Sequence, residues 1–251
     1  MRKGRFVLRK VALITGASRG IGAACARLFA ENGYEIAIGY RASEERAAAL
    51  QSELRAGGHT AECFQADVAD RAQAFAMVER TLSSLGRIDV LVNNAGVAQQ
   101  KLFGDLTEAD WDRMFAVNVK GAFHCAQAAL PQMLRRGEGV ILNLSSIWGI
   151  AGASCEVHYS AAKAAVIGFT KALAKELGPS GVRVNCIAPG VIETDMNAQL
   201  TEETLGALRE ETPLGVIGRP EDVAHTALFL ASPGARFLTG QVLSPNGGIV
   251  I

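Results

Sequence analysis

The chain has 251 residues, of which 49% are hydrophobic, and its 25 Lys and Arg residues are balanced by 25 Asp and Glu residues. Because this balance leaves no net positive charge to attract a phosphate backbone, it argues against a nucleic-acid partner. Polar residues interrupt every apolar stretch before it reaches the roughly 18 residues of a membrane-spanning helix, so we expect no membrane insertion.

The first ten residues carry five basic side chains, and no apolar core of a secretory signal follows them. We therefore expect residues 1–9 to be a flexible lead-in to the first strand. The five cysteines are odd in number, far apart and never spaced as C-x-x-C, and the four histidines are equally scattered. This pattern predicts no metal site and a reducing, cytoplasmic location.

From residue 11 onward, short β-branched runs alternate with longer stretches rich in Ala, Leu and Glu. Several short runs are apolar throughout, as in the strands of a parallel sheet that is covered on both faces. The predicted strands are Val11–Thr15, Glu35–Gly39, Ala61–Gln65, Val90–Val92, Val140–Leu144, Arg183–Ala188 and Gln241–Leu243. The predicted helices are Ile21–Glu31, Glu44–Ala56, Ala72–Leu85, Glu108–Arg135, Val157–Gly178 and Glu221–Ala231. This alternation predicts an α/β fold, a doubly wound parallel sheet with helices on both faces, in one domain that spans residues 1–251.

A glycine-rich turn links the first predicted strand to the first predicted helix. It reads Thr15-Gly16-Ala17-Ser18-Arg19-Gly20-Ile21-Gly22. Such a turn lets the backbone approach a pyrophosphate, whose charge the free N–H groups and the positive dipole end of the helix receive. A tight turn without a ligand is the alternative, but the strand–turn–helix context favours nucleotide binding.

This T-G-x-x-x-G-x-G spacing, together with four further motifs in order, resembles the short-chain dehydrogenase/reductase family. The other motifs are Asn93-Asn94-Ala95-Gly96, Ser146, Tyr159-Ser160-Ala161-Ala162-Lys163 and Pro189-Gly190. The resemblance implies a single-domain Rossmann-type fold and an NAD(P)-dependent oxidoreductase that interconverts a carbonyl and an alcohol. It implies cofactor contacts at Gly16, Ser18, Arg19, Gly20, Ile21, Gly22, Tyr40, Asn94, Ala95, Gly96, Tyr159, Lys163, Pro189, Gly190, Ile192 and Thr194.

The end of the second strand distinguishes NADP from NAD. An NAD site places a carboxylate there to hold the ribose 2′-OH, but this chain has none before Glu44. Arg19 and Arg41 are therefore predicted to bind a 2′-phosphate through charge-assisted hydrogen bonds, which makes NADP(H) the expected cofactor. Two ordinary surface arginines are the alternative. Asp67 and Val68 resemble the family's adenine contact, although Asp67 is equally compatible with a helix N-cap.

Tyr159 and Lys163 are four residues apart in a predicted helix, so their side chains share one face. A phenol has a pKa of about 10, which a neighbouring ammonium group and an oxidised nicotinamide would both lower. By resemblance, Tyr159 protonates the substrate carbonyl and Lys163 also holds the nicotinamide ribose. The resemblance makes Ser146, rather than Ser145, the donor to the developing oxyanion, and it places Asn118 in a proton relay to Lys163. Taken singly, each of these residues also has an ordinary structural interpretation.

The sequence indicates the substrate less clearly than it indicates the reaction. Residues Thr239–Gly248 resemble the end of 3-oxoacyl-acyl-carrier-protein reductases, which implies reduction of a ketone on a small molecule or on a carrier-bound thioester. However, Gly137 and Ser180 stand where that group has carrier-binding arginines. A non-catalytic NADPH-binding sensor or scaffold is the competing class, which the complete catalytic set disfavours.

The stretch from Ser146 to Tyr159 more closely resembles reductases that act on a 5-aminopentanone modification of elongation factor P. In this stretch, Trp148 and Glu156 suit a cationic amine through cation–π contact and ion pairing. The alternative for Glu156 is a first-turn residue that only complements the helix dipole.

Two predicted helices, Glu108–Arg135 and Val157–Gly178, are rich in small residues. In the family, these helices form an intersubunit four-helix bundle, so the resemblance implies a homotetramer. Packing of the same faces on the chain's own sheet is the alternative. Residues 196–211 stand where the family has a mobile substrate lid.

Overall fold

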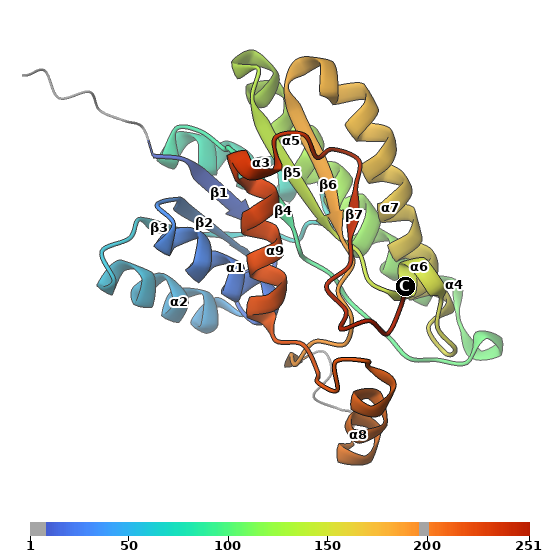
Figure 1. Ribbon diagram of the computed structural model, residues 1–251. Coiled ribbons are helices and arrows are strands. Elements are labelled where there is room, and N and C mark those ends of the chain that lie inside the picture. Colours follow the sequence, from blue (N-terminus) through green and yellow to red (C-terminus); the bar gives the residue numbers. More distant parts are fainter. Residues whose placement is uncertain (1–8, 196–200) are drawn as a thin grey trace, which may run out of the picture.

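The computed structural model describes residues 9–195 and 201–251, in which seven strands form one parallel sheet (Figure 1). The strand order is β3-β2-β1-β4-β5-β6-β7. The strands are β1 (Val11–Ile14), β2 (Glu35–Tyr40), β3 (Ala61–Gln65), β4 (Val90–Asn93), β5 (Gly139–Leu144), β6 (Val182–Ile187) and β7 (Val242–Leu243). The order reverses between β1 and β4, and open α/β sheets bind ligands at the carboxyl ends of the strands beside such a reversal. The predicted doubly wound Rossmann-type fold is confirmed, whereas the lead-in expected at residues 1–9 lies, apart from residue 9, outside the described residues.

Six helices cover the two faces of the sheet. One face carries α1 (Gly20–Glu31), α2 (Glu44–Ala56) and α9 (Pro220–Ala231), and the other carries α3 (Arg71–Leu85), α5 (Gly121–Arg136) and α7 (Val157–Leu177). Successive residues of a strand point to opposite faces, so Ala12 and Ile14 pack in the first layer while Val11 and Leu13 pack in the second. Because water reaches neither face, β1 is apolar at every position.

The helix predicted over Glu108–Arg135 is divided, so the prediction of one continuous helix is wrong. It consists of α4 (Glu108–Phe115), a π-helical segment η2 (Ala116–Lys120) and α5. The interruption lies at Asn118, whose Nδ2 donates to the carbonyl oxygen of Met114 at 3.0 Å. A side chain that takes a helical carbonyl in this way competes with the regular backbone ladder, and π-helical segments of this kind are frequent at functional sites.

Several short elements were not predicted from the sequence. They are α6 (Trp148–Ala151), α8 (Glu202–Glu211) and the 3₁₀ helices η1 (Phe103–Asp105), η3 (Gly178–Ser180) and η5 (Pro233–Ala235). The segment α8 falls within the lid expected over residues 196–211, of which residues 196–200 lie outside the described residues. None of the helices in the described part of the chain has the length and apolar character needed to cross a membrane.

Candidate active site

A pocket of about 320 Å³ opens at the carboxyl ends of β4, β5 and β6. Figure 1 shows α6 and α8 at this end of the sheet. The predicted residues that line the pocket are Ile21, Asn94, Gly96, Ser146, Trp148, Glu156, Tyr159, Lys163, Pro189, Gly190, Ile192 and Thr194. The fold therefore brings the motifs that follow three different strands to one cavity.

The glycine-rich turn is held in place by the motif that follows β4. Gly16 and Gly20 have φ angles of +64° and +54°, a conformation that side-chain-bearing residues rarely adopt. Asn94 Nδ2 donates to the carbonyl oxygens of Thr15 (2.9 Å) and Gly16 (3.1 Å), and a Cβ at Gly22 would lie only 2.6 Å from that Nδ2. This close packing requires glycine at position 22 and fixes the turn against β4.

The start of α1 is free to receive an anion. Its N-cap residue, Arg19, makes no side-chain capping hydrogen bond, and its first turn contains no acidic side chain. The N–H groups of the first helical turn and the positive end of the helix dipole therefore fit the pyrophosphate of a dinucleotide. Ser18 and Ile21 flank these groups in the turn and the first turn of the helix.

The region beside the end of β2 contains three guanidinium groups. Arg41 Nη1 lies 3.5 Å from Asp67 Oδ2, and Arg19 Nη1 lies 3.3 Å from Asp195 Oδ2. Arg46 pairs with the same oxygen of Asp195. The role of Arg46 was not predicted, because a position in the first turn of α2 gives no sign that it lies beside residues 19 and 195. More than half of the side-chain surface of each arginine is exposed, so all three are accessible to a phosphate.

Asp67 is not the N-cap of the following helix, so that alternative is wrong. Asp70 caps α3 by accepting a hydrogen bond from Gln73 N at 3.0 Å. Asp67 Oδ1 instead accepts from Ala69 N at 2.9 Å, in the turn after β3. Val68 is buried beside it. Tyr40 is buried and is the last residue of β2, so no carboxylate occupies the end of this strand.

Tyr159 and Lys163 lie on the first and second turns of α7, with Lys163 Nζ 5.5 Å from the centre of the Tyr159 ring. Burial raises the pKa of Tyr159 to about 12, although a hydrogen bond with Ser146 lowers it and nearby Glu156 raises it further. Burial also lowers the pKa of Lys163 to about 8. In the protein by itself the pKa of Tyr159 is therefore raised, not lowered as predicted, because burial disfavours the phenolate, while the lowering expected from an oxidised nicotinamide stays a prediction.

The two serines after β5 have different partners. Ser145 Oγ donates to the carbonyl oxygen of Lys163 at 2.8 Å, so this hydroxyl ties β5 to α7. Ser146 Oγ accepts a hydrogen bond from Trp148 N at 3.2 Å and is also hydrogen bonded with Tyr159. An oxygen that already accepts from the backbone keeps its own hydrogen for donation. The choice of Ser146 over Ser145 thus has a structural reason.

Asn118 lies behind the pocket wall, beside Lys163. Its Oδ1 accepts from Val97 N at 3.3 Å, and its Nδ2 donates to Val97 O at 3.0 Å as well as to Met114 O. A Cβ at Gly96 would lie 2.7 Å from Asn118 Oδ1 and 3.4 Å from Lys163 Nζ. Lys163 Nζ itself donates to Leu144 O at 2.9 Å. Gly96 therefore lies against both Asn118 and Lys163, with no room for a side chain.

The far wall of the pocket follows β6. Thr194 lies against the glycine-rich turn, since its Cγ2 would be 3.3 Å from a Cβ at Gly20. Ile192 is buried and pairs with Gly218 in a parallel bridge. Pro189 accepts a backbone hydrogen bond from Ile147 at 3.0 Å, which joins this wall to the segment after Ser146.

Glu156 faces the pocket and does not cap α7. It occupies the N-cap position but makes no capping hydrogen bond, and its Oε1 instead accepts from Gln100 Nε2 at 3.3 Å. Burial raises the pKa of this carboxyl above its ordinary value. Gln99 and Gln100 also line the pocket but were not predicted. The sequence signal that could have identified these two glutamines is their position just after the Asn93–Gly96 motif, at the carboxyl end of β4.

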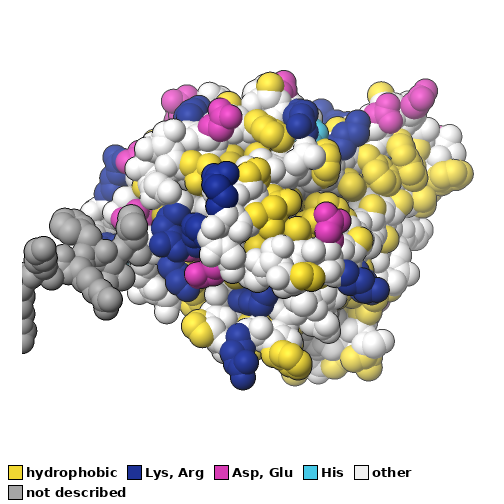
Figure 2. All heavy atoms as spheres, turned by 90° about the horizontal axis from the view of Figure 1, so that it is seen from above, with side chains coloured by type: hydrophobic (Ala, Val, Ile, Leu, Met, Phe, Trp, Pro, Cys, Tyr) yellow, Lys and Arg dark blue, Asp and Glu magenta, His cyan; other side chains and the backbone are white. Residues whose placement is uncertain are grey.

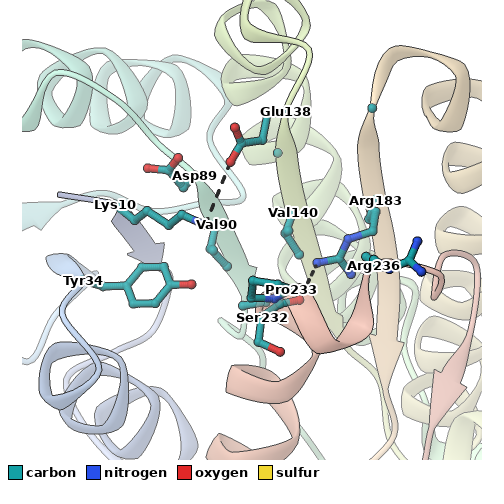
Figure 3. Close-up of a pocket in the computed structure, with 13 residues that line it drawn as sticks. Lys10, Tyr34, Asp89, Val90, Glu138, Val140, Arg183, Ser232, Pro233 and Arg236 are labelled. Carbon is teal, nitrogen blue, oxygen red and sulfur yellow. Dashed lines mark hydrogen bonds and ion pairs between the residues drawn. The ribbon is translucent and has the colours of Figure 1, made fainter. Parts of the chain in front are cut away.

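A second pocket, of about 190 Å³, lies at the amino ends of the strands (Figure 3). Lys10 and Glu138 form an ion pair across it at 4.0 Å, and Arg183 donates to the carbonyl oxygens of Ser232 and Leu238. It shares no lining residue with the larger pocket. No group of three or more potential metal ligands occurs among residues 9–195 and 201–251. We therefore place the chemistry in the larger pocket.

Comparisons with known proteins agree with this geometry. The family model described as Enoyl-(Acyl carrier protein) reductase matches residues 16–250. The 3-oxoacyl-acyl-carrier-protein reductase FabG of Staphylococcus aureus is 44% identical over 242 residues, covering 96% of this chain and 98% of the relative. FabG of Thermotoga maritima is 43% identical over 242 residues, with the same coverage of 96% and 98%. A crystal structure of a blue fluorescent protein from a metagenomic library, in complex with NADPH, has a TM-score of 0.91 and 40% identity, covering 96% of this chain and 98% of that one.

Proposed function

Because this chain belongs to the short-chain dehydrogenase/reductase family, we propose that it reduces the ketone of a 3-oxoacyl thioester on an acyl carrier protein, with NADPH as reductant. The observation that carries the proposal is the meeting of Ser146, Tyr159 and Lys163 at one pocket that also borders the glycine-rich turn. The curated relatives named above act on this substrate, and the solved structure binds NADPH.

NADPH would supply a hydride to the carbonyl carbon. Its pyrophosphate would be held by the N–H groups of Gly16 and of residues 18–22, and its 2′-phosphate by Arg19 and Arg41. Asp67 and Val68 would contact the adenine. The residues that would position the nicotinamide end are Asn94, Ala95, Gly96, Tyr159, Lys163, Pro189, Gly190, Ile192 and Thr194.

The protein's own groups handle the proton. Tyr159, whose pKa is raised to about 12, is protonated throughout the neutral range and donates its phenolic proton to the carbonyl oxygen. Ser146 donates a hydrogen bond to the same oxygen as negative charge develops there. Lys163 stabilises the phenolate that remains, and Asn118, next to it across Gly96, belongs to the path by which Tyr159 regains a proton.

The test is a rate comparison with purified protein on two substrates, a 3-oxoacyl thioester of acyl carrier protein and an aminoketone-modified protein. We expect NADPH oxidation with the thioester to be the faster reaction, and NADH to be a poor substitute. A protein that binds NADPH but oxidises it with neither ketone would instead be a sensor or scaffold.

One observation favours a second candidate, a reductase of a 5-aminopentanone modification on elongation factor P. In the described part of the chain, Glu156 has no ionic partner, yet it lines the pocket together with Trp148. A carboxylate beside an indole ring suits a cationic amine. In addition, Arg136, near the expected carrier-binding position, is bound to buried Asp89 and is not free for an acidic carrier. If Glu156→Gln slows only the aminoketone reaction, the second candidate is the correct one.

We further propose a homotetramer with two-fold axes in the cytoplasm. Large apolar side chains are exposed on and beside the helices that carry the small residues; these are Leu102, Phe103, Trp111, Phe123, Leu134 and Val157. Figure 2 shows hydrophobic side chains gathered at the right of that view. Small residues of α5 such as Ala126 and Ala129 pack inward on the sheet, whereas Ala164 and Ala172 of α7 are exposed. Light scattering that gives a particle of the monomer mass at micromolar concentration would contradict the tetramer.

A further inference from the structure

His158 is a completely buried residue directly before Tyr159 on α7. Its Nε2 lies 3.0 Å from Gln99 Oε1. Its Nδ1 is buried and has no hydrogen-bond partner among the described residues. The mechanism proposed above does not use this side chain.

Three contacts join the segment after β4 to the start of α7. Lys101 N donates to Cys155 O at 2.8 Å, and Gln100 Nε2 donates to Glu156 Oε1 at 3.3 Å. The contact between His158 and Gln99 is the third, and it is the one nearest to Tyr159 in the sequence. The two segments run in opposite directions, so these three contacts follow one another along one wall of the pocket.

The hydrogen bonds determine which nitrogen of His158 carries the proton. Gln99 Nε2 donates to Asp110 Oδ1 at 3.0 Å, so Gln99 presents its oxygen to His158. That oxygen can only accept, so Nε2 of the imidazole must carry the hydrogen, and Nδ1 of the neutral ring has a free lone pair. Asp110 is fixed in turn by Lys101 at 2.7 Å and by the Thr107 backbone at 3.0 Å. The amide of Gln99 is therefore held at both ends.

We propose that His158 is a positioning residue that, in its neutral Nε2–H form, attaches the first turn of α7 to the pocket wall at Gln99 and so fixes the hydroxyl of Tyr159. The proposal rests on the proposed function, in which Tyr159 is the proton donor. Because the two residues are adjacent on one helical turn, a shift of His158 displaces Tyr159 as well. A misplacement of about 1 Å in a proton donor costs up to about a hundredfold in rate.

Protonation of His158 would leave the Nε2–H in place but would be costly at this site. The added hydrogen on Nδ1 would have no acceptor, and the new charge would be buried. Burial lowers the pKa of His158, and so does Lys101, while Asp110 on α4 raises it. Because the folded state prefers the neutral ring, the packing around His158 is complete at neutral pH and is weakened as pH falls through the lowered pKa.

The test compares His158→Gln and His158→Phe with the native protein. A glutamine places its Nε2 where the imidazole has Nε2 and does not titrate, whereas phenylalanine fills the space and leaves Gln99 Oε1 without its donor. We expect His158→Gln to keep kcat within about threefold at neutral pH and to lose the decline in kcat on the acid side. We expect His158→Phe to lower kcat at least about tenfold with the KM for NADPH unchanged. His225→Gln on α9, an exposed histidine, is the control and should leave the profile unchanged.

An acid-side decline that persists in His158→Gln, or a native kcat in His158→Phe, overturns the proposal. If His158→Phe fails to fold, nitrogen NMR of the native imidazole decides instead, since an Nδ1–H tautomer or an ordinary pKa overturns it. Any ketone that the native protein reduces with NADPH can serve in the assay. Native protein that reduces no ketone contradicts the proposed function, which distinguishes that failure from a failure of the positioning role.

Discussion

Replacement of Gly96 by alanine tests whether the space between Asn118 and Lys163 is as tight as the structure indicates. The added Cβ would lie 2.7 Å from Asn118 Oδ1, a separation that real Cβ atoms essentially never show. Asn118 cannot yield easily, because it is 3% exposed and its amide is hydrogen bonded to Val97 and Met114. Overpacking a tight site costs about 1–3 kcal/mol, and a weakened hydrogen bond adds about 1 kcal/mol. We therefore expect Gly96→Ala to lower the free energy of unfolding by about 2–4 kcal/mol.

The same substitution should damage catalysis more than stability. If Asn118 or Lys163 shifts by even part of an ångström, the proton path to Tyr159 is misaligned, and we expect kcat to fall by about 10²-fold. A suitable control is Gly178→Ala at the end of α7, where a Cβ would meet nothing within 4 Å apart from the chain neighbours. That variant should be unchanged in kcat, and it should lose less stability than Gly96→Ala, the small loss arising because Pro179 follows and disfavours a helical conformation of alanine.

Urea denaturation and steady-state kinetics on both variants provide the two measurements. If Gly96→Ala has native stability and native kcat, the residues around it are mobile enough to absorb a methyl group. The argument for a rigid link between Asn118 and Lys163 would then be refuted. A loss of stability without a loss of kcat would show that Asn118 is structural only.

Other expected outcomes concern the acid, the lysine and the cofactor phosphate. Tyr159→Phe should lower kcat by at least about 10²-fold and leave NADPH binding, measured by fluorescence titration, unchanged. A Tyr159→Phe variant that keeps most of its activity would show that another group is the acid. Burial lowers the pKa of Lys163 to about 8, so the ammonium group is lost as pH rises through that value. NADPH should therefore bind more weakly above about pH 8, and Lys163→Ala should bind it weakly without this pH dependence. Arg41→Asp should shift the ratio of the kcat/KM values from NADPH toward NADH by at least about tenfold, and Arg46→Ala should shift this ratio less in the same direction. Equal efficiency of the native protein with both cofactors would contradict both expectations.

Much of the fold follows from the order of residues along the chain. Apolar runs separated by amphipathic stretches predict a parallel sheet covered on both faces, and the predicted strands and long helices agree with the structure to within a residue or two at nearly every boundary. The relation of Tyr159 to Lys163 is equally local, because two residues four apart on a helix share a face whatever surrounds them. The glycine-rich turn can be recognised in the same way, since its glycines lie within eight consecutive residues, although Asn94 from after β4 holds it in place.

The remaining features depend on residues far apart in the sequence. The pKa of Tyr159 is set mainly by how much protein covers it, and only the packed structure shows that burial raises this pKa. The pairing of Arg19 and Arg46 with Asp195, and of Gln99 with His158, joins positions that are 59 to 176 residues apart. Asn118, in the π-helical segment, is likewise hydrogen bonded to Val97 on the segment after β4, a contact that a helical propensity does not contain. Propensity and spacing act over a few residues, whereas burial and close approach are decided by which elements the fold brings together.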